Sequence, residues 1–503
     1  MERLRALSPW TLLAASLAAA LYLKLAWVGE DAYIVFRSVE QLFAGHGPVW
    51  NPHERVQVFT SPLWFGLLAL GRCCGGDLFG IALGLGALAW AGTLLALRRL
   101  AGSPGRFLLL VLGLAGANAV LDYTASGLES GLLYLLLALT VLAERRSRLP
   151  GPRGGAALTG LALVVGLVLV TRLDHVFLVG PPFAAALWRQ RPLAGRRLAG
   201  LLALAFGPLA AWSVFATIWY GFPLPNTAYA KLDTGISAFV LVRQGVRYVL
   251  HTAGWDALVV AGLGGFVWWA RRERGEWPWL VAVLLQLAYV VRVGGDFMQG
   301  RFLAGIFLVA AAVAIAARGA DLVRRRALWS GLILYVGLFP WTPVNKPVHG
   351  GSSLIRLGIA DERAVYADAL SVWRWAAARR AQRPFPDLVW REEGEALRGG
   401  SGGPVVAPNI GVLGWAAGPD PLIIDPLALS DPFLARLPCD PAWRIGHFPR
   451  PVPPAYLASL AAGAPVVLDD PDRQALARDI ALITRGDDLF AAERWRAILR
   501  RNP

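Results

Sequence analysis

Two adjacent carboxylates, Glu30 and Asp31, directly follow the first apolar stretch of the chain, Pro9–Val28. A carboxylate held beside apolar helices can take a proton from a hydroxyl group, so this acid pair is a candidate general base. An acid at such a position could equally end a helix and face water. The pair therefore indicates a reaction only if further reactive groups accompany it.

Further polar residues stand singly in apolar surroundings over the next 270 or so positions of the chain. Charged side chains at membrane depth cost about 2.5–3.5 kcal/mol each on insertion scales, and those that persist usually face a cavity, a partner or a substrate. The candidates are Arg37, His46, Glu129, Arg172, Asp174, His175, Asn226, Lys231, Asp296 and Arg301.

Several of these candidates also have a purely structural explanation. Arg172 and Asp174 could form a local ion pair at a helix end. Lys231 could extend toward the lipid headgroups. Glu129 could cap the helix that begins there, with Ser126 as its N-cap. Only the co-occurrence of these residues on one face of a membrane would indicate a functional site.

Carboxylates together with single cations suit the transfer of a group from a lipid-linked phosphate donor. The acceptor hydroxyl loses a proton as it attacks, and a carboxylate can accept that proton. The leaving group is a phosphate anion, which Arg and Lys side chains can hold. A transporter would instead need polar residues through the membrane depth or matching broken helices in two halves, and the sequence shows neither pattern.

The elements that must position these residues are long apolar runs that recur down to about Pro340. The chain is 56% hydrophobic and only 17% charged, whereas a soluble domain carries about 25% charged residues. Because about 20 apolar residues span the hydrocarbon core, we predict a polytopic α-helical membrane protein with about eleven transmembrane helices. Between Pro62 and Leu97 we expect one crossing and one shorter re-entrant or interfacial piece, split at Cys73–Asp77.

Basic residues gather in the short turns between the apolar runs, which is typical of cytoplasmic turns. Arg3 and Arg5 place the N-terminus in the cytoplasm, and we expect Pro9–Val28 to be a retained first helix. The predicted cytoplasmic turns are Arg98–Arg106, Arg145–Arg148, Arg189–Arg197, Arg271–Arg274 and Arg324–Arg326.

Counting crossings between these turns places all the candidate residues outside the cytoplasm. We expect the chain from Trp341 onward to be outside as well. The predicted outer segments before it are Gly29–Ser61, Tyr123–Ser130, Thr171–His175, Tyr220–His251 and Arg292–Arg301.

The tail changes character, with more Pro, Asp and Glu and shorter apolar runs. We predict a division into a transmembrane catalytic domain, residues 1–340 with a first outer loop 29–61, and a C-terminal mixed α/β domain, residues 341–503. Pro408–Pro438 suggests two strands and a helix started by Ser430 or Asp431. Asp469–Gly486 suggests a capped amphipathic helix.

The net charge of +15 does not indicate a nucleic-acid partner, because the arginines lie in the turns between apolar runs. The three cysteines provide neither a disulfide framework nor the spacing of a zinc site.

Six segments, in this order along the chain, resemble motifs of bacterial GT-C glycosyltransferases, above all the terminal arabinofuranosyltransferases of cell-wall arabinan. The first is the predicted outer loop, and the last lies in the tail, so the resemblance spans nearly the whole chain. They are EDAYIVFRSVEQLFAGHGPVWNPHERVQVFTSPLW (Glu30–Trp64), TASGLES (Thr124–Ser130), TRLDHVFL (Thr171–Leu178), LPNTAYAK (Leu224–Lys231), GGDFMQGRFL (Gly294–Leu303) and IDPLALSDPFLAR (Ile424–Arg436).

This resemblance implies a GT-C fold in a bacterial plasma membrane, a polyprenyl-phosphate-sugar donor and an outward-facing active site. It implies Asp31 as the catalytic base, with Glu30 where the family often has an aspartate, and leaves open which acid acts. Arg37, Lys231 and Arg301 become candidates for contacts with the donor phosphate or sugar. The remaining candidates of the donor site and pocket are His46, Glu129, Arg172, Asp174, Asn226 and Asp296.

The chain also departs from the family pattern. Leu173 and His175 stand where the family has Pro and Gly, and Phe59 stands where it has Tyr. These departures leave the sugar, the acceptor and the linkage open. A divalent cation is open as well, because Glu30, Asp31 and Asp296 could supply oxygen ligands but no spacing requires one.

The sequence thus predicts an inverting membrane glycosyltransferase that moves a sugar from a polyprenyl phosphate to an envelope glycan, lipid or protein on the outer face. The alternative is a non-catalytic assembly or scaffold protein of envelope or motility machinery, which would keep the fold and tolerate loss of Glu30 and Asp31.

Overall fold

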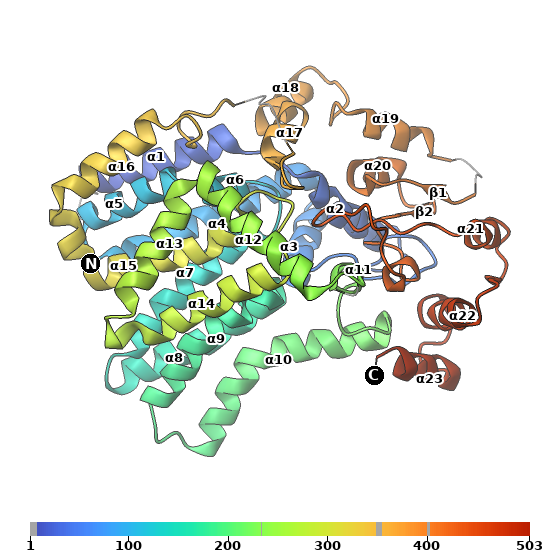
Figure 1. The fold of residues 1–503 in the computed structure, drawn as a ribbon, viewed down its shortest axis with the longest axis horizontal. Helices are drawn as coiled ribbons and strands as arrows, with labels where there is room; N and C mark the ends of the chain where they lie inside the picture. Colours follow the sequence, from blue (N-terminus) through green and yellow to red (C-terminus); the bar gives the residue numbers. More distant parts are fainter. Residues whose placement is uncertain (1–7, 233, 349–354, 400–402, 503) are drawn as a thin grey trace. The chain divides into compact units, whose positions relative to one another are not determined.

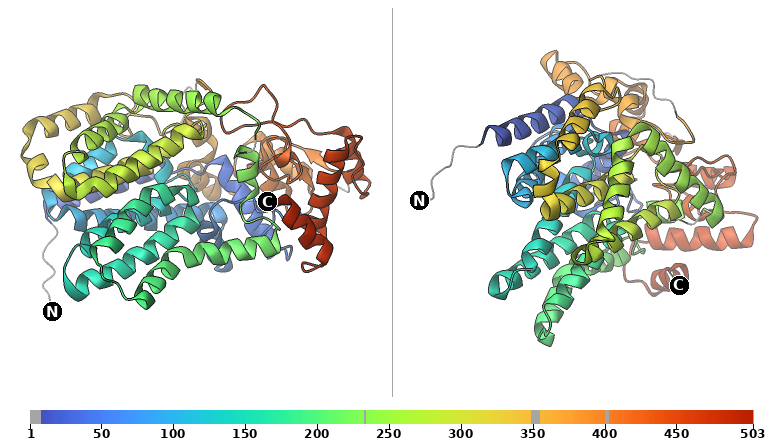
Figure 2. Two further views of the ribbon diagram at one scale, coloured as in Figure 1. Left: turned by 60° about the horizontal axis from the view of Figure 1, so that its bottom comes forward. Right: turned by 60° about the vertical axis from the view of Figure 1, so that its left-hand side comes forward.

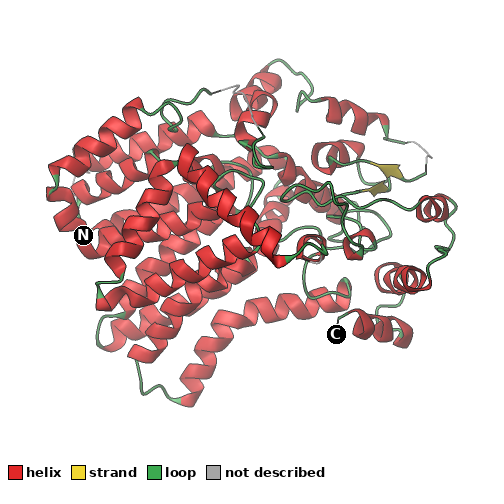
Figure 3. Cartoon of the chain, viewed as in Figure 1, coloured by secondary structure: helices red, strands yellow, loops and turns green. Residues whose placement is uncertain are grey.

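The computed structural model describes residues 8–232, 234–348, 355–399 and 403–502. Arg3 and Arg5, on which the predicted orientation depends, lie outside these ranges. Helices dominate the described chain, and its only ladder joins the two-residue strands β1 (Val405–Val406) and β2 (Ile423–Ile424) in parallel (Figure 3). Contacts divide the chain into two units, which are described separately below.

Unit 1 comprises Met1–Val28, Phe79–Pro208 and Phe239–Val372. It is a helical bundle in which α7, α8 and α9 follow one another as packed neighbours and α15 packs against α5, α7, α13 and α14 (Figures 1 and 2). Its helices are α1 (Pro9–Leu25), α4 (Leu78–Ala101), α5 (Pro104–Ala115), α6 (Asn118–Thr124), α7 (Ser130–Ser147), α8 (Gly151–Thr171), η1 (Leu173–His175), α9 (Val176–Arg189), the first part of α10 (Gly195–Trp219), α12 (Ala238–Trp255), α13 (Ala257–Ala270), η2 (Arg274–Glu276), α14 (Trp277–Arg292), α15 (Arg301–Arg324), α16 (Arg326–Leu338) and α17 (Glu362–Leu370).

Four described helices, α4, α8, α10 and α15, are long and apolar enough to cross a membrane. Two bent pairs, α5 with α6 at 87° and α12 with α13 at 112°, raise the number to six if each pair is one span. The chain is therefore a multi-pass membrane protein by composition and helix length, and the predicted count of about eleven stays a prediction. Many remaining helices are too short, since a 16-residue helix such as α14 is only about 24 Å long.

The break expected between Pro62 and Leu97 is present. α3 (Pro62–Cys73) has 12 residues, and α4 has 24. At about 1.5 Å per residue, α4 can span the hydrocarbon core and α3 cannot, which agrees with one crossing and one shorter piece. The start of α3 is set locally, because Ser61 Oγ accepts a hydrogen bond from Trp64 N and Pro62 occupies the first helical position.

Unit 2 comprises Gly29–Leu78, Leu209–Ala238 and Trp373–Pro503. The predicted first outer loop contains a helix that the sequence analysis did not predict, α2 (Glu30–Phe43). The other elements are α3, the end of α10, α11 (Asn226–Leu232), α18 (Val372–Arg380), α19 (Val389–Ala396), α20 (Ile410–Ala417), η3 (Leu434–Arg436), α21 (Pro454–Ala461), α22 (Pro471–Arg485) and α23 (Ala492–Arg501).

The prediction of a mixed α/β tail is wrong in its proportions, since the described tail is mainly helical with only the β1–β2 pair. The first predicted strand is helix α20, which packs against α2 and α19. The predicted capped helix is confirmed as α22, whose N-cap Asp470 accepts a hydrogen bond from Arg473 N.

The contact-based division also differs from the predicted boundary at residue 340. Unit 1 continues to Val372, and unit 2 unites the tail with two earlier segments. The reason is a shared core, in which Phe222 and Ala230 from the segment after α10 pack with tail residues such as Phe433, Ile480 and Ile498.

Candidate active site

The acid pair opens α2 in unit 2, where an acidic first turn suits the positive end of the helix dipole and the Asp31 carboxylate can supply the negative charge. Glu30 is only 9% exposed, and its Oε1 accepts a hydrogen bond from Val412 N at 3.0 Å. Burial, and then the neighbouring charge of Asp31, raise the pKa of Glu30 to about 8. A Cβ atom on Gly411 would lie 2.2 Å from the carbonyl oxygen of Glu30, so only glycine permits this close approach.

Asp31 differs from its neighbour because it is half-buried rather than buried. A general base must reach the proton that it accepts. The sequence left open which acid acts, and the burial of Glu30 against the tail favours Asp31.

Arg37, one helical turn further along α2 than Tyr33, is 1% exposed. Its guanidinium donates to Gly414 O at 3.0 Å and to Pro421 O at 2.7 Å, and it lies 4.3 Å from the ring centre of Trp50. Through these contacts Arg37 links α2 to the tail. His46 is half-buried, with Nδ1 2.6 Å from Gln41 Oε1.

Asn226 is buried at the start of α11 and holds a tail loop. Its Nδ2 donates to the carbonyl oxygens of Ala428, Leu429 and Asp431 at 3.0–3.1 Å. Ala428 has a positive φ of 62°, which is uncommon for a residue other than glycine, so the amide of Asn226 supports a strained backbone.

Lys231 lies in the last turn of α11 and is half-buried. The charge of Lys231 acts on His447 in the tail. The pKa of His447 is lowered to about 3, first by burial, then by Arg444 and then by Lys231. Lys231 is thus a cation that remains partly open to solvent within unit 2.

Five further candidates form one ionic cluster in unit 1, the Glu129 cluster (Glu129, Arg172, Asp174, Asp296 and Arg301). Oε1 of Glu129 accepts hydrogen bonds from Arg172 Nη1 at 3.0 Å and from Arg301 Nη2 at 3.1 Å. Arg172 also binds Asp174 through two bonds of 2.9 and 3.0 Å, and Arg301 Nη1 lies 3.7 Å from Asp296 Oδ2. The cluster joins three of the predicted outer segments at one end of the bundle.

The electrostatics of the Glu129 cluster follow from these pairs. Burial alone would raise the pKa of Asp174, but Arg172 and His175 outweigh it and hold that pKa well below its usual range. Burial likewise opposes ionisation of Glu129, and Arg301 and Arg172 nevertheless lower its pKa. Three carboxylates therefore face two guanidiniums, so the Glu129 cluster has no surplus positive charge for a phosphate.

One of the structural explanations considered for these residues is confirmed and another is wrong. Arg172 and Asp174 do form the local ion pair. Glu129 does not cap its helix through its side chain, because α7 begins at Ser130 and both Glu129 contacts go to arginines. Ser126 Oγ instead donates to Tyr123 O at 3.1 Å.

No family model matches the chain. In sequence it is 29% identical over 516 residues to the "Terminal beta-(1->2)-arabinofuranosyltransferase" of Mycobacterium tuberculosis, covering 84% of this chain and 80% of that protein. It is 28% identical over 320 residues to the protein of the same name from Corynebacterium glutamicum, covering 55% of this chain and 46% of that protein. The chain is a homologue of these enzymes. The predicted resemblance and the predicted class, a membrane glycosyltransferase, are confirmed.

Solved structures resemble this glycosyltransferase more distantly. ArnT from Cupriavidus metallidurans bound to undecaprenyl phosphate has a TM-score of 0.49 at 15% identity, covering 82% of this chain and 86% of ArnT. The Archaeoglobus fulgidus oligosaccharyltransferase, in complex with Zn and sulfate, has a TM-score of 0.47 at 13% identity, covering 85% and 62%. At these values the structures add nothing to the assignment of the site.

The divalent cation that the sequence left open for this glycosyltransferase has no evident ligand set. Within the described ranges, no group of three or more His, Cys, Asp or Glu side chains is placed to hold a metal ion. Glu30 is engaged by the backbone of Val412, and Asp296 by Arg301.

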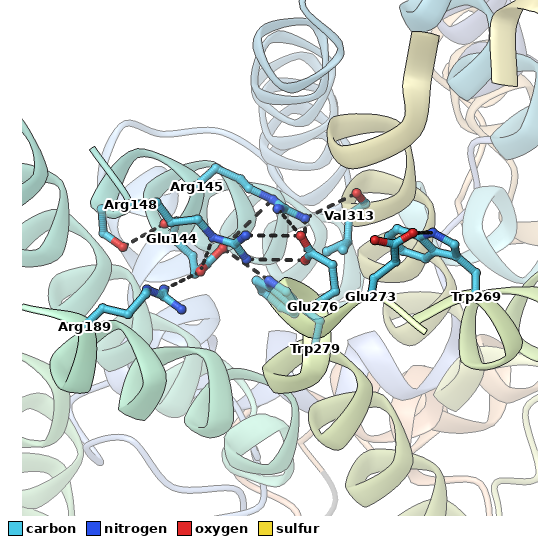
Figure 4. Close-up of polar contacts among 10 residues, drawn as sticks. Glu144, Arg145, Arg148, Arg189, Trp269, Glu273, Glu276, Trp279 and Val313 are labelled. Carbon is cyan, nitrogen blue, oxygen red and sulfur yellow. Dashed lines mark hydrogen bonds and ion pairs between the residues drawn. The ribbon is translucent and has the colours of Figure 1, made fainter. Parts of the chain in front are cut away.

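The sequence analysis missed a second ionic cluster of the glycosyltransferase, the Glu144 cluster (Glu144, Arg145, Arg148, Arg189 and Glu276), shown in Figure 4. The fully buried Glu144 receives Arg148 Nε at 2.9 Å and Arg189 Nη2 at 2.5 Å, and Glu276 binds Arg145 at 2.6 Å. Trp279 Nε1 also donates to Glu144 at 3.3 Å. The cluster joins residues in or beside three turns predicted to be cytoplasmic. The available signal in the sequence was the presence of Glu144 and Glu276 next to arginine-rich turns.

Proposed function

We propose that this glycosyltransferase transfers a sugar from a polyprenyl-phosphate donor to a glycan, lipid or protein of the envelope, on the outer face of the membrane and with inversion at the anomeric carbon. The observation that carries the proposal is the sequence similarity, over 84% of the chain, to an enzyme named for terminal arabinofuranosyl transfer. Both relatives carry that name, so arabinofuranose is the first sugar to test.

Asp31 is the general base of the proposed reaction. The acceptor hydroxyl gives its proton to the Asp31 carboxylate while its oxygen bonds to the anomeric carbon. The bond between that carbon and the phosphate oxygen breaks, and the polyprenyl phosphate leaves as an anion. A single displacement of this kind inverts the anomeric configuration.

Lys231 is the residue that we assign to the donor phosphate. Its half-buried ammonium can approach an anion, whereas the guanidinium of Arg37 is buried against backbone carbonyls. A cation at the leaving phosphate stabilises the charge that develops in the transition state. Asn226, whose amide donates hydrogen bonds to the tail loop, fixes the start of α11, the short helix that carries Lys231.

The test is a transfer assay with purified protein in liposomes, a polyprenyl-phosphate arabinofuranose donor and an arabinan oligosaccharide acceptor. We expect Asp31→Asn to lower the rate by about 10²–10⁴-fold, the range for loss of a general base, without changing expression or gel-filtration behaviour. Asp472→Asn is the matched control, because Asp472 is an exposed carboxylate in the first turn of α22.

A folded Asp31→Asn variant that keeps full activity would refute the role of Asp31. Wild-type protein that transfers no sugar from any polyprenyl-phosphate donor, while its deletion still disturbs the envelope, would instead favour the scaffold alternative.

A further inference from the structure

A groove of about 620 Å³ runs between three helices of unit 1, α5, α13 and α15. Its walls are apolar and include Leu109, Phe266, Phe307 and Ile315. This volume lies within the range of 300–1,000 Å³ typical of small-molecule sites. All three helices belong to candidate membrane spans, so the groove adjoins the lipid phase.

Glycines leave the groove open. A Cβ atom on Gly113 of α5 or on Gly265 of α13 would meet nothing within 4 Å, although both residues line the groove. The space beside these two glycines is therefore not filled by other side chains.

One end of the groove carries arginines, tryptophans and the two carboxylates of Glu273 and Asp321. Arg272, Arg318 and Arg325 line it together with Trp268, which is 57% exposed. Arg318 is paired with Glu273 and Asp321. Among the described residues, neither Arg272 nor Arg325 forms an ion pair with a carboxylate. Arg272 instead donates to Trp268 O at 2.7 Å and covers its ring at 4.0 Å.

Other arginines are close in sequence to those that line this end. Arg271 and Arg274 follow α13, and Arg324 and Arg326 flank Arg325 at the junction of α15 and α16. Glu273 adjoins the Glu144 cluster, because its carbonyl oxygen accepts a hydrogen bond from Glu276 N at 2.9 Å (Figure 4 shows both side chains). That cluster belongs to the turns predicted to be cytoplasmic. The basic end of the groove is therefore at the opposite end of α15 from Arg301.

We propose that this groove is a binding site for an anionic phospholipid of the cytoplasmic leaflet, separate from the sugar donor. One acyl chain lies along the apolar walls, and the headgroup phosphate meets Arg272 and Arg325 beside Trp268. Polybasic segments at the cytoplasmic end of a membrane helix attract anionic lipids by about this mechanism, and tryptophan is favoured at the same depth. Because the groove requires neither Asp31 nor Lys231, the proposal is independent of the proposed transfer reaction.

The experiment is a titration of the delipidated full-length protein with phosphatidylglycerol and, separately, phosphatidylcholine, followed by native mass spectrometry. We expect phosphatidylglycerol to bind at least 10-fold more tightly. Arg272→Gln combined with Arg325→Gln should weaken its binding about 10- to 30-fold and leave phosphatidylcholine unchanged. The control pair is Arg247→Gln with Arg292→Gln, two exposed arginines of α12 and α14 outside the groove.

A second pair of variants tests the acyl-chain position. Gly265→Leu fills the groove and should weaken phosphatidylglycerol binding at least 5-fold. Gly264→Leu is the control, because Gly264 is also open to space but does not line the groove. Equal affinity for the two phospholipids, an unaffected Gly265→Leu variant, tighter binding of polyprenyl phosphate at this groove, or a co-purifying polypeptide displaced from it would each overturn the proposal.

Discussion

Glu30 and Asp31 are neighbours in sequence, but burial gives them different chemistry. Glu30 is enclosed against α20, where ionisation is unfavourable, and its raised pKa of about 8 reflects that enclosure. Asp31 is half-buried and can meet a substrate. The close approach that separates the two acids depends on Gly411, which has no side chain to block it.

The pKa of Glu30 leads to a prediction about pH and stability. In the folded protein Glu30 keeps its proton up to about pH 8, whereas the unfolded chain loses it near the ordinary value of 4.5. Between these values the folded state binds more protons, so its stability falls as the pH rises. Glu30→Gln removes this penalty and can keep the hydrogen bond from Val412 N. We therefore expect its thermal midpoint to exceed that of the wild type by a few degrees at pH 8 and to match it at pH 5.

The comparison requires both proteins in the same detergent, with thermal unfolding followed at several pH values. A constant difference between the two midpoints from pH 5 to pH 8 would contradict the assignment of the raised pKa to Glu30.

Helix α7 shows how an element is fixed by charges at both of its ends. Glu129 precedes its first residue and binds Arg172 and Arg301, and Glu144, near its last turn, binds Arg148 and Arg189. The two carboxylates are 15 residues apart (144 minus 129), which is about 22 Å along a helix. Four elements of unit 1 donate hydrogen bonds to these two carboxylates. They are η1 through the preceding residue Arg172, α9 through Arg189, α14 through Trp279, and α15 through Arg301.

Removal of the buried carboxylate at the second end tests this arrangement. Because Glu144→Gln removes the buried carboxylate shared by two partly exposed guanidiniums, we expect a loss of about 1–3 kcal/mol in stability and a measurable drop in the thermal midpoint. Glu392→Gln is the control, since the side chain of Glu392 is 68% exposed and its pair with Arg391 should contribute at most about 1 kcal/mol. Equal effects of the two substitutions would show that the Glu144 cluster does not stabilise the bundle.

Local signals explain which elements could be predicted from the sequence. α22 could be predicted because Asp470 and Pro471 specify its start within four residues. α20 could not, since the apolar run IGVLGWAA suits a strand or a helix, and its neighbours α2 and α19 decide between them. In the candidate site, too, contacts between residues close in sequence could be predicted and contacts between distant residues could not. The Arg172–Asp174 pair lies within three residues, whereas the Glu129–Arg301 pair joins positions 172 apart.

Unit 2 as a whole depends on segments from three parts of the chain. Asn51 exchanges two hydrogen bonds with the backbone of Ile423, at 3.0 and 3.1 Å. Arg450 donates to Ala230 O at 2.7 Å, and Phe222 belongs to the same hydrophobic core as the tail. The tail therefore completes its core with residues far from it in sequence, since Arg450 and Ala230 are 220 positions apart.

We expect the isolated tail, residues 341–503, to show no cooperative thermal transition by far-UV circular dichroism, because those contacts are missing. A polypeptide that joins Gly29–Leu78, Leu209–Ala238 and Trp373–Pro503 through Gly/Ser linkers should regain one. A sharp transition of the isolated tail would show instead that residues 341–503 fold independently, as the sequence predicts.

The charges at the two ends of α7 also limit how unit 1 can move. A shift of α7 along its own axis by one turn, about 5.4 Å, would break buried ion pairs at both ends simultaneously. Tilting α7 together with η1, α9, η2, α14 and α15 breaks none of them. Any rearrangement of this bundle during a catalytic cycle should therefore be a rigid pivot of the tied helices rather than a sliding of one helix past another.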